Sequence, residues 1–365
     1  MTSAADGLPQ VFPSLILWNI DIPAQPSSSP AAAGDVVAIP LQSGDISAWR
    51  LSDRTPAWST KLFVQGPLAS ANDRIVVQTK ESIVALAGAT GKPVWTVNAG
   101  FLTAPILARD GWVVAATAEA LTAFRLSDGA KVWGQKIGAV EQRPTIEGDR
   151  LYVPVADGRL VALDLESGAL QWERQLGASP TEPLALADRV YLGAGRNFVC
   201  LRTRNGVIDW QWETIGAPIV GAPAADGQHI YMTAMDNLLR AMDRVSGNNR
   251  WKADLGYRPE AGPTVIGTTV AVPGRSASIK GFDTRTGRPA VQLALPDQMI
   301  VQPLFFVGSE GRQLIAAVTA NLRGENKLTL AGSVLPFLPI APLATLPGTA
   351  LTTPKPISSA KRPGY

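Results

Sequence analysis

The chain has one cysteine and one histidine among its 365 residues, and both shortages exclude kinds of chemistry. A single cysteine, Cys200, cannot form an intramolecular disulfide. A single histidine, His229, cannot by itself build a histidine-rich metal centre. We interpret Cys200 as a small buried residue, because corresponding segments elsewhere in the chain carry alanine. We interpret His229 as a hydrogen-bonded turn residue rather than a catalytic base.

Long apolar runs and long runs of one charge are also missing. No stretch approaches the roughly 18 apolar residues that span a membrane, and residues 1–13 lack the basic start and apolar core of a secretory signal. We therefore expect no transmembrane segment and identify no signal peptide. The 33 basic and 30 acidic residues give a net charge of +3, so we expect no nucleic-acid partner. Sequence motifs of serine hydrolases, zinc proteases and phosphate-binding loops are absent as well.

A glycine followed four residues later by a tryptophan recurs along the chain. In the stretch from Arg159 to Trp172, an alternating strand leads into a turn at Glu166-Ser167-Gly168, and a second strand carries the tryptophan. The full copies are Gly91/Trp95, Gly129/Trp133, Gly168/Trp172, Gly206/Trp210 and Gly247/Trp251. Degenerate copies have Arg54 before Trp58 and Gly287 before Val291. The interval of 37 to 41 residues indicates a structural repeat.

Prolines mark the same repeat independently. They are Pro30, Pro67, Pro105, Pro144, Pro183, Pro223, Pro263 and Pro303, separated by 37 to 40 residues. Two markers thus agree on eight repeats of about 40 residues, a period that predicts a β-propeller with four strands in each blade. A proline at the start of each first strand fits the inner edge of a blade, where its missing N–H needs no partner. Segments with helical periodicity are absent, which disfavours a helical repeat.

The two ends of the repeat array complement each other. Leu15 to Ile22 reads as a surplus strand, whereas the last repeat offers only three strands, so we predict that this segment completes the last blade and supplies Trp18 as its tryptophan. The predicted fold is all-β: a single eight-bladed β-propeller of four-stranded antiparallel blades over residues 15–332. Residues 1–14 form an N-terminal arm in this prediction. Residues 333–365 form a proline-rich tail, in which Pro336, Pro339 and Pro342 favour polyproline II.

The repeat resembles a known family. The pattern A-x-D-x-x-x-G-x-x-x-W, carried by Ala162, Asp164, Gly168 and Trp172, resembles the tryptophan-docking motif of the PQQ-like β-propeller superfamily. In organisation the chain is most similar to the outer-membrane assembly factor BamB and its relatives. The resemblance implies a periplasmic or cell-envelope location. It also implies that the tryptophans pack between adjacent blades, namely Trp18, Trp58, Trp95, Trp133, Trp172, Trp210 and Trp251.

The resemblance leaves two classes of function open. The superfamily includes quinoprotein dehydrogenases, which hold pyrroloquinoline quinone together with Ca²⁺. This chain lacks the adjacent cysteine pair, the large insertions and a D-x-D-x-D calcium run, so we expect no cofactor and no metal. We favour a non-catalytic protein-binding scaffold, a BamB-like adaptor in cell-envelope assembly. A PQQ-dependent dehydrogenase and a ligand-sensing propeller remain the alternatives.

The predicted binding site is the channel mouth. Loops that link the last strand of one blade to the first strand of the next should converge there on one face, and loops are where function concentrates. We predict that a protein partner or an extended peptide binds this face, and we expect a monomer or one component of a hetero-complex. Ordinary solvated loop charges are the alternative interpretation. The candidate residues are Glu141, Arg143, Glu182, Arg258, Glu260 and Gln302.

Overall fold

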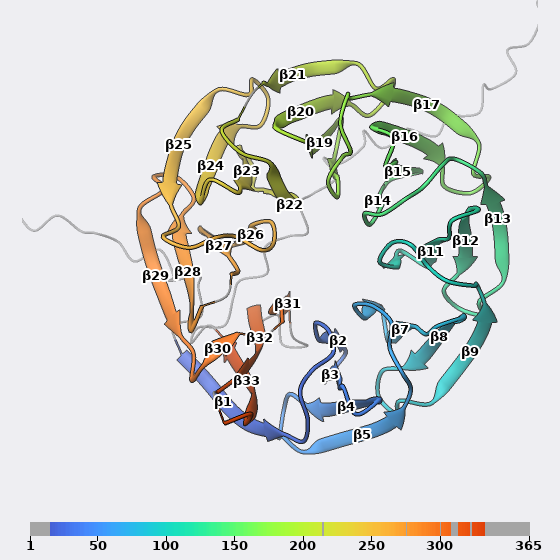
Figure 1. The fold of residues 1–365 in the computed structure, drawn as a ribbon, viewed down its shortest axis with the longest axis vertical. Helices are drawn as coiled ribbons and strands as arrows, with labels where there is room; N and C mark the ends of the chain where they lie inside the picture. The colour runs from blue at the N-terminus through green and yellow to red at the C-terminus, as the bar shows by residue number, and fades with distance from the viewer. Residues whose placement is uncertain are drawn as a thin grey trace, which may run out of the picture.

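A ring of eight antiparallel sheets surrounds a central opening in a computed structural model of the chain (Figure 1). The structure describes residues 15–332 apart from residues 214, 275, 300, 308–312 and 322, and this part contains no helix. The prediction of an all-β, eight-bladed propeller is therefore confirmed. The predicted N-terminal arm and proline-rich tail lie outside the described residues.

Each of the first four blades consists of four strands that pair in chain order, from the inner strand at the opening to the outer strand on the wall. Blade 1 contains β2 (Ala31–Ala33), β3 (Val36–Pro40), β4 (Asp45–Arg50) and β5 (Pro56–Lys61). Blade 2 contains β6 (Ala69–Ala71), β7 (Arg74–Gln78), β8 (Ser82–Ala87) and β9 (Pro93–Asn98). Blade 3 contains β10 (Leu107–Arg109), β11 (Trp112–Ala116), β12 (Leu121–Arg125) and β13 (Lys131–Gln135). Blade 4 contains β14 (Thr145–Glu147), β15 (Arg150–Pro154), β16 (Arg159–Asp164) and β17 (Leu170–Gln175).

The next three blades repeat this plan, and the eighth is assembled from both ends of the described chain. Blade 5 contains β18 (Leu184–Leu186), β19 (Arg189–Ala194), β20 (Asn197–Arg202) and β21 (Ile208–Trp212). Blade 6 contains β22 (Ile219–Ala225), β23 (His229–Ala234), β24 (Leu238–Asp243) and β25 (Asn249–Asp254). Blade 7 contains β26 (Thr264–Ile266), β27 (Thr269–Val272), β28 (Ser278–Asp283) and β29 (Pro289–Ala294). Blade 8 contains β30 (Gln298–Met299), β31 (Leu304–Val307), β32 (Gln313–Ala320), β33 (Asn326–Gly332) and β1 (Leu15–Ile22).

The ring closes where β1 pairs with β33. The two strands run antiparallel from Leu15 opposite Gly332 to Ile22 opposite Asn326. The predicted closure by the N-terminal strand is therefore confirmed. The short strand β30, which also pairs with β32, was not predicted.

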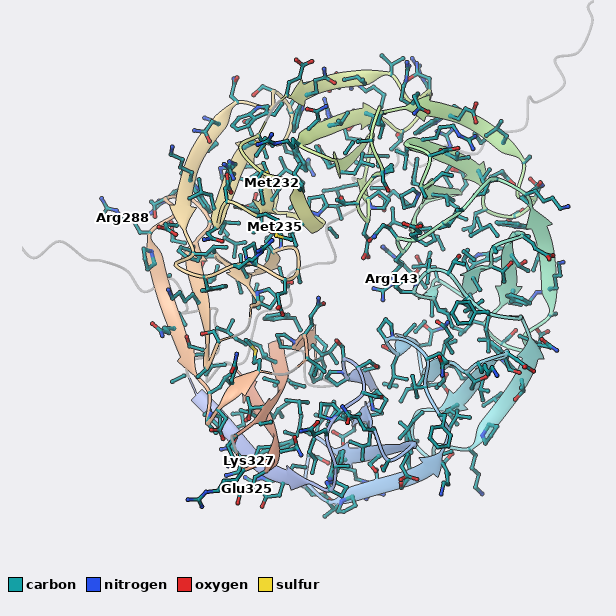
Figure 2. All side chains as sticks on the ribbon, viewed as in Figure 1. Arg143, Met232, Met235, Arg288, Glu325 and Lys327 are labelled. Carbon is teal, nitrogen blue, oxygen red and sulfur yellow. The ribbon has the colours of Figure 1, made fainter. Side chains whose placement is uncertain are left out.

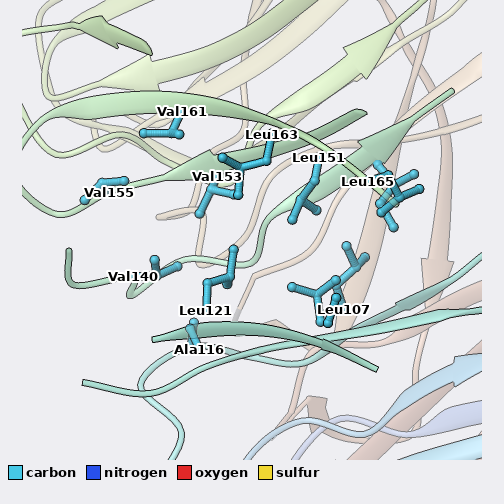
Figure 3. Close-up of a cluster of buried hydrophobic side chains, with 14 of the residues drawn as sticks. Leu107, Ala116, Leu121, Val140, Leu151, Val153, Val155, Val161, Leu163 and Leu165 are labelled. Carbon is cyan, nitrogen blue, oxygen red and sulfur yellow. The ribbon is translucent and has the colours of Figure 1, made fainter. Parts of the chain in front are cut away.

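Buried aliphatic side chains fill the space between neighbouring blades. The third strand of blade 4 is buried from Leu160 to Leu163 on both faces, because each face packs against a neighbouring blade. Figure 3 shows Val161 and Leu163 of this strand in one buried cluster with Leu121 of blade 3. The outer strands are instead half-exposed. In β17, Trp172 is buried between exposed neighbours.

The outer-strand tryptophan of a blade reaches the turn between the third and fourth strands of the next blade. Trp133 Nε1 donates a hydrogen bond of 2.8 Å to the carbonyl of Leu165, and its indole lies against Gly168. Gly168 has a φ of 72°, and a Cβ there would come within 2.7 Å of the Trp133 ring, so only glycine fits. The same indole-to-carbonyl bond joins Trp58 to Gly88, Trp95 to Leu126, Trp172 to Thr203 and Trp251 to Thr284.

Two tryptophan positions depart from this pattern. Gly247 lies against the Trp210 indole, yet Trp210 Nε1 is buried with no hydrogen-bond partner among the described residues. The hydroxyl of Tyr191 donates to the carbonyl of Arg244, the equivalent acceptor, at 3.0 Å. Blade 7 carries Val291 where other blades carry tryptophan. Since β33 and β1 are not consecutive in the chain, blade 8 has no turn between them that could offer the acceptor carbonyl.

Trp18 occupies the last tryptophan position, at the boundary between blade 8 and blade 1. It is 7% exposed and belongs to the buried cluster that contains Val37, Ile39 and Trp49 of blade 1. The first and last blades are therefore held together by side-chain packing as well as by the β1–β33 ladder.

Candidate functional site at the channel mouth

In most blades, a residue that lies upstream of the inner strand already pairs with the second strand. Isolated bridges make this pairing at Leu102 with Thr117, Pro180 with Ala194 and Pro259 with Gly274, and β30 makes the corresponding pairing in blade 8. The residues between this pairing and the inner-strand proline leave the ladder. We call these segments the mouth loops, and they are residues 27–29, 65–66, 103–104, 141–143, 181–182, 221–222, 260–262 and 301–302.

The prolines end these mouth loops at buried positions. Pro144, Pro183 and Pro263 are buried and are followed directly by the inner strands. A proline fixes φ and has no N–H that would need a partner, so each mouth loop enters its strand at a defined angle. The regular spacing of the prolines in the sequence thus corresponds to similarly placed loops around the ring.

Neighbouring mouth loops are tied to one another around the opening. Ser28 Oγ donates to the carbonyl of Gly66 at 3.0 Å. Thr103 Oγ1 donates at 2.7 Å to the carbonyl of Val140, which directly precedes the next mouth loop. Between blades 6 and 7 the backbones nearly touch, since a Cβ on Gly262 would lie 1.9 Å from the carbonyl oxygen of Ala222. These contacts make the mouth loops a stiff rim rather than independent loops.

Arg143 and Glu182, both predicted site residues, meet on this rim. Arg143 Nη1 lies 3.7 Å from Glu182 Oε1, and the side chains are 32% and 33% exposed. Figure 2 shows Arg143 directed toward the central opening. Burial raises the pKa of Glu182, and the Arg143 guanidinium acts in the opposite direction. Glu141, on the same mouth loop as Arg143, is exposed.

The other three predicted residues form a separate group on blades 6 to 8. Gln302 Nε2 lies 3.4 Å from the backbone carbonyl of Glu260, to which it donates. Arg258 Nε contacts the Sδ atom of Met235 at 3.2 Å, and Met235 is 38% exposed. In Figure 2, Met235 and Arg143 lie on opposite sides of the opening. The six predicted residues therefore lie in two groups on this face, five of them in mouth loops and Arg258 just before one, and they do not form one cluster.

Two exposed phenylalanines on this face were missed by the sequence reading. Phe63 is 63% exposed and Phe101 is 67% exposed, each in a loop between an outer strand and the next inner strand. The signal was present, because each phenylalanine stands four residues before an inner-strand proline, Pro67 or Pro105. Large exposed aromatic side chains of this kind are typical anchors of protein interfaces.

The described residues do not fit a PQQ and calcium site. Among them, no group of three or more histidine, cysteine, aspartate or glutamate side chains could hold a metal ion. Cys200 is buried in β20, and burial raises the pKa of its thiol to about 12. The ring of His229 is held by Asp226, with Nδ1 and Oδ2 3.1 Å apart. A calcium-held quinone needs clustered oxygen ligands, which these residues do not assemble.

The described part of the chain contains no helix that is long and apolar enough to cross a membrane.

Eight antiparallel blades, five of which are joined to the next blade by an indole-to-carbonyl bond, define a propeller of the PQQ-like repeat type. The profile of the family described as outer membrane protein assembly factor BamB matches residues 42–252 and 183–320. The chain belongs to this family. No curated protein sequence matches the chain significantly.

Solved structures of different function share this fold. BamB from Moraxella catarrhalis is 18% identical, with a TM-score of 0.69, and the match covers 87% of this chain and 99% of that chain. A europium-containing methanol dehydrogenase is 13% identical, with a TM-score of 0.67 over 87% of this chain and 93% of that one. A quinohemoprotein alcohol dehydrogenase from Comamonas testosteroni is 13% identical, with a TM-score of 0.67 over 87% and 76%. At these identities the likeness shows the fold alone.

Proposed function

We propose that this protein is a non-catalytic scaffold that binds a protein partner through its mouth loops, as a BamB-like adaptor in outer-membrane protein assembly. The observation that supports this most is the rim of tied mouth loops, which carries Arg143, Glu182 and Glu260 around one opening. Family membership supports the same proposal.

The chemistry of the rim suits recognition of a folded protein surface. Mixed charges on a stiff frame favour orientation and specificity, and exposed apolar side chains supply contact area. Phe63, Phe101 and Met235 are such apolar side chains on the same face as the charged residues. A partner with apolar side chains and both signs of charge would complement this face.

Site-specific photo-crosslinking in the native host tests the proposal. A photoreactive residue is placed at Glu141 or at Gln302, which lie on separate mouth loops, and at Asp128 as the control. Asp128 lies in the turn between β12 and β13, and this turn is at the opposite end of the blade because antiparallel strands alternate in direction. We expect both mouth positions to capture the same protein and position 128 to capture none. A protein captured only from position 128 contradicts the proposal.

The dehydrogenase alternative has its own test. The purified protein is incubated with PQQ, Ca²⁺ and an artificial electron acceptor, and oxidation of alcohols and sugars is followed. The scaffold proposal predicts no turnover above the rate without protein. Turnover that depends on both PQQ and protein would replace the scaffold proposal with a quinoprotein dehydrogenase.

A further inference from the structure

The outer strand of blade 3, β13, has one free edge. It is the terminal strand of its sheet, so one row of its backbone N–H and C=O groups has no ladder partner in the sheet. The segment from residue 130 to residue 140 contains no acidic residue, and it carries Lys131 and Lys136. Both lysines are exposed, and neither forms an ion pair with another described residue. The free edge is therefore flanked by two available positive charges.

A groove lies on each side of this edge. The groove between blades 3 and 4 has a volume of about 300 Å³, and its lining includes Val161, Leu163 and Leu170. Figure 3 shows Val161 and Leu163 in the aliphatic cluster at this boundary. The groove between blades 2 and 3 has a volume of about 220 Å³ and is lined in part by Phe124 and Lys131. Both grooves are mixed in character: the first includes Lys136, Arg159 and Glu173 besides its aliphatic side chains, and the second includes Thr122.

Gly134 gives β13 no side chain at a position where the equivalent strands carry one. Gly134 pairs with Thr122, and the position corresponds to Glu173 of β17 and Gln211 of β21 by the same register. Glu173 lines the groove beside its own strand, whereas at Gly134 the atoms nearest to the position of a Cβ belong to the flexible end of Lys131. Side chains that guard an outer edge normally prevent unwanted pairing. A glycine in a strand often marks a place where another backbone approaches closely.

We propose that β13 accepts an extended segment of a protein partner as a fifth strand of blade 3. Side chains of an added strand alternate between the two faces of the sheet, so they enter the two grooves in turn. Aliphatic side chains of the added strand would contact Ile137 and Leu170 in the groove between blades 3 and 4. Small polar and acidic side chains fit the groove that contains Lys131. This surface lies on the outer wall and is separate from the mouth loops, so it extends the proposed function to a second, extended ligand.

Fluorescence anisotropy with a labelled heptapeptide tests this proposal. The peptide has glutamate at both ends and valine alternating with threonine between them. One control peptide has lysine at both ends, and a second carries N-methyl groups on alternate residues. We expect the first peptide to bind, the lysine-ended peptide to bind at least tenfold more weakly, and the methylated peptide not to bind.

Two matched substitutions locate the binding. Gly134→Glu adds a negative side chain to the edge. Its Cβ would meet the flexible end of Lys131 at 3.1 Å and lie at an ordinary contact distance of 3.6 Å from Thr122 Oγ1, so the fold should tolerate it. Gln211→Glu makes the same residue at the equivalent position of β21. We expect Gly134→Glu to weaken binding at least tenfold and Gln211→Glu to leave it unchanged, with thermal melting confirming that both variants fold.

Any of three results would overturn the proposal. The first is that the glutamate-ended peptide does not bind the wild type. The second is that this peptide binds the wild type and Gly134→Glu equally, and the third is that the glutamate-ended and lysine-ended peptides bind the wild type equally. Analytical ultracentrifugation could give a fourth result that overturns the proposal. A wild-type dimer that Gly134→Glu dissociates would mean that a second copy of this chain occupies the edge, and not a partner segment. The double variant Arg143→Glu/Arg258→Glu should bind the peptide as the wild type does, which separates this surface from the mouth loops.

Discussion

Replacing Gly168 by alanine tests how the blades are joined. Gly168 has a φ of 72°, and a Cβ there would lie 2.7 Å from Cδ2 of the Trp133 indole. Two costs follow. An L-residue in the left-handed region costs about 1 to 2 kcal/mol. Forcing the indole away from a packed interface costs about a further 1 to 3 kcal/mol.

Gly148 supplies the matched control for this substitution. It has a φ of 60°, in the turn between β14 and β15 of the same blade, and a Cβ there would meet no atom within 4 Å. Gly148→Ala therefore carries the backbone cost alone. We expect a loss of about 1 to 2 kcal/mol for Gly148→Ala and about 2 to 5 kcal/mol for Gly168→Ala.

Equilibrium unfolding in urea measures both losses under the same conditions. The indole contact predicts that Gly168→Ala is the more destabilising variant by at least about 1 kcal/mol. Equal losses for the two variants would refute the reasoning, because the close approach of Trp133 would then contribute nothing to the interface.

Three further predictions concern other residues of the repeat. Trp172→Ala should lower the free energy of unfolding by about 3 to 5 kcal/mol in the urea assay, and a loss under about 1 kcal/mol would mean that the side chain is not packed between blades. Arg54→Gly should raise the free energy of unfolding by about 1 kcal/mol, because Arg54 has a φ of 68° where the equivalent turns use glycine. An unchanged free energy of unfolding would contradict this prediction. Hydrogen bonds from Arg250 and the Ser246 amide hold the pKa of Asp243 below its ordinary value, so Asp243→Asn should destabilise the fold at neutral pH. A carboxyl group with a lowered pKa stabilises the fold only at pH values above its pKa in the unfolded chain. The difference in stability between the wild type and Asp243→Asn should therefore shrink as the pH falls below about 4. Thermal melting at several pH values measures it, and a difference that stays constant would contradict the prediction.

The fold could be predicted because each repeated residue has one local physical role. Glycine at the turn is required by a positive φ and by the indole against it, and tryptophan at the outer strand is required by the carbonyl of the next blade. Both requirements recur at every regular boundary, so they appear as a period in the sequence. The closing strand could be predicted because an incomplete last blade and a surplus first strand are both visible without coordinates.

The site could be predicted only in part, because its contacts depend on conformations that have no short motif. Arg143 and Glu182 are 39 residues apart, and their ion pair requires two mouth loops to leave the ladder in the same direction. The tyrosines Tyr152, Tyr191 and Tyr231 were likewise missed as a series, although they occupy the second strands of three consecutive blades and pack against their tryptophans. The edge of β13 at Gly134 could not be identified as a binding site from the sequence, because the grooves that flank it are formed by residues of neighbouring blades.

The central claim is that the mouth loops bind the partner, and the affinity of the captured and purified partner tests it most directly. Isothermal titration calorimetry compares the wild type, Arg143→Glu/Arg258→Glu and Asp128→Lys, after thermal melting has shown that all three fold. The account predicts that the double mouth variant binds at least tenfold more weakly and that Asp128→Lys binds as the wild type does. Unchanged affinity in the double mouth variant, or a loss confined to Asp128→Lys, would contradict it.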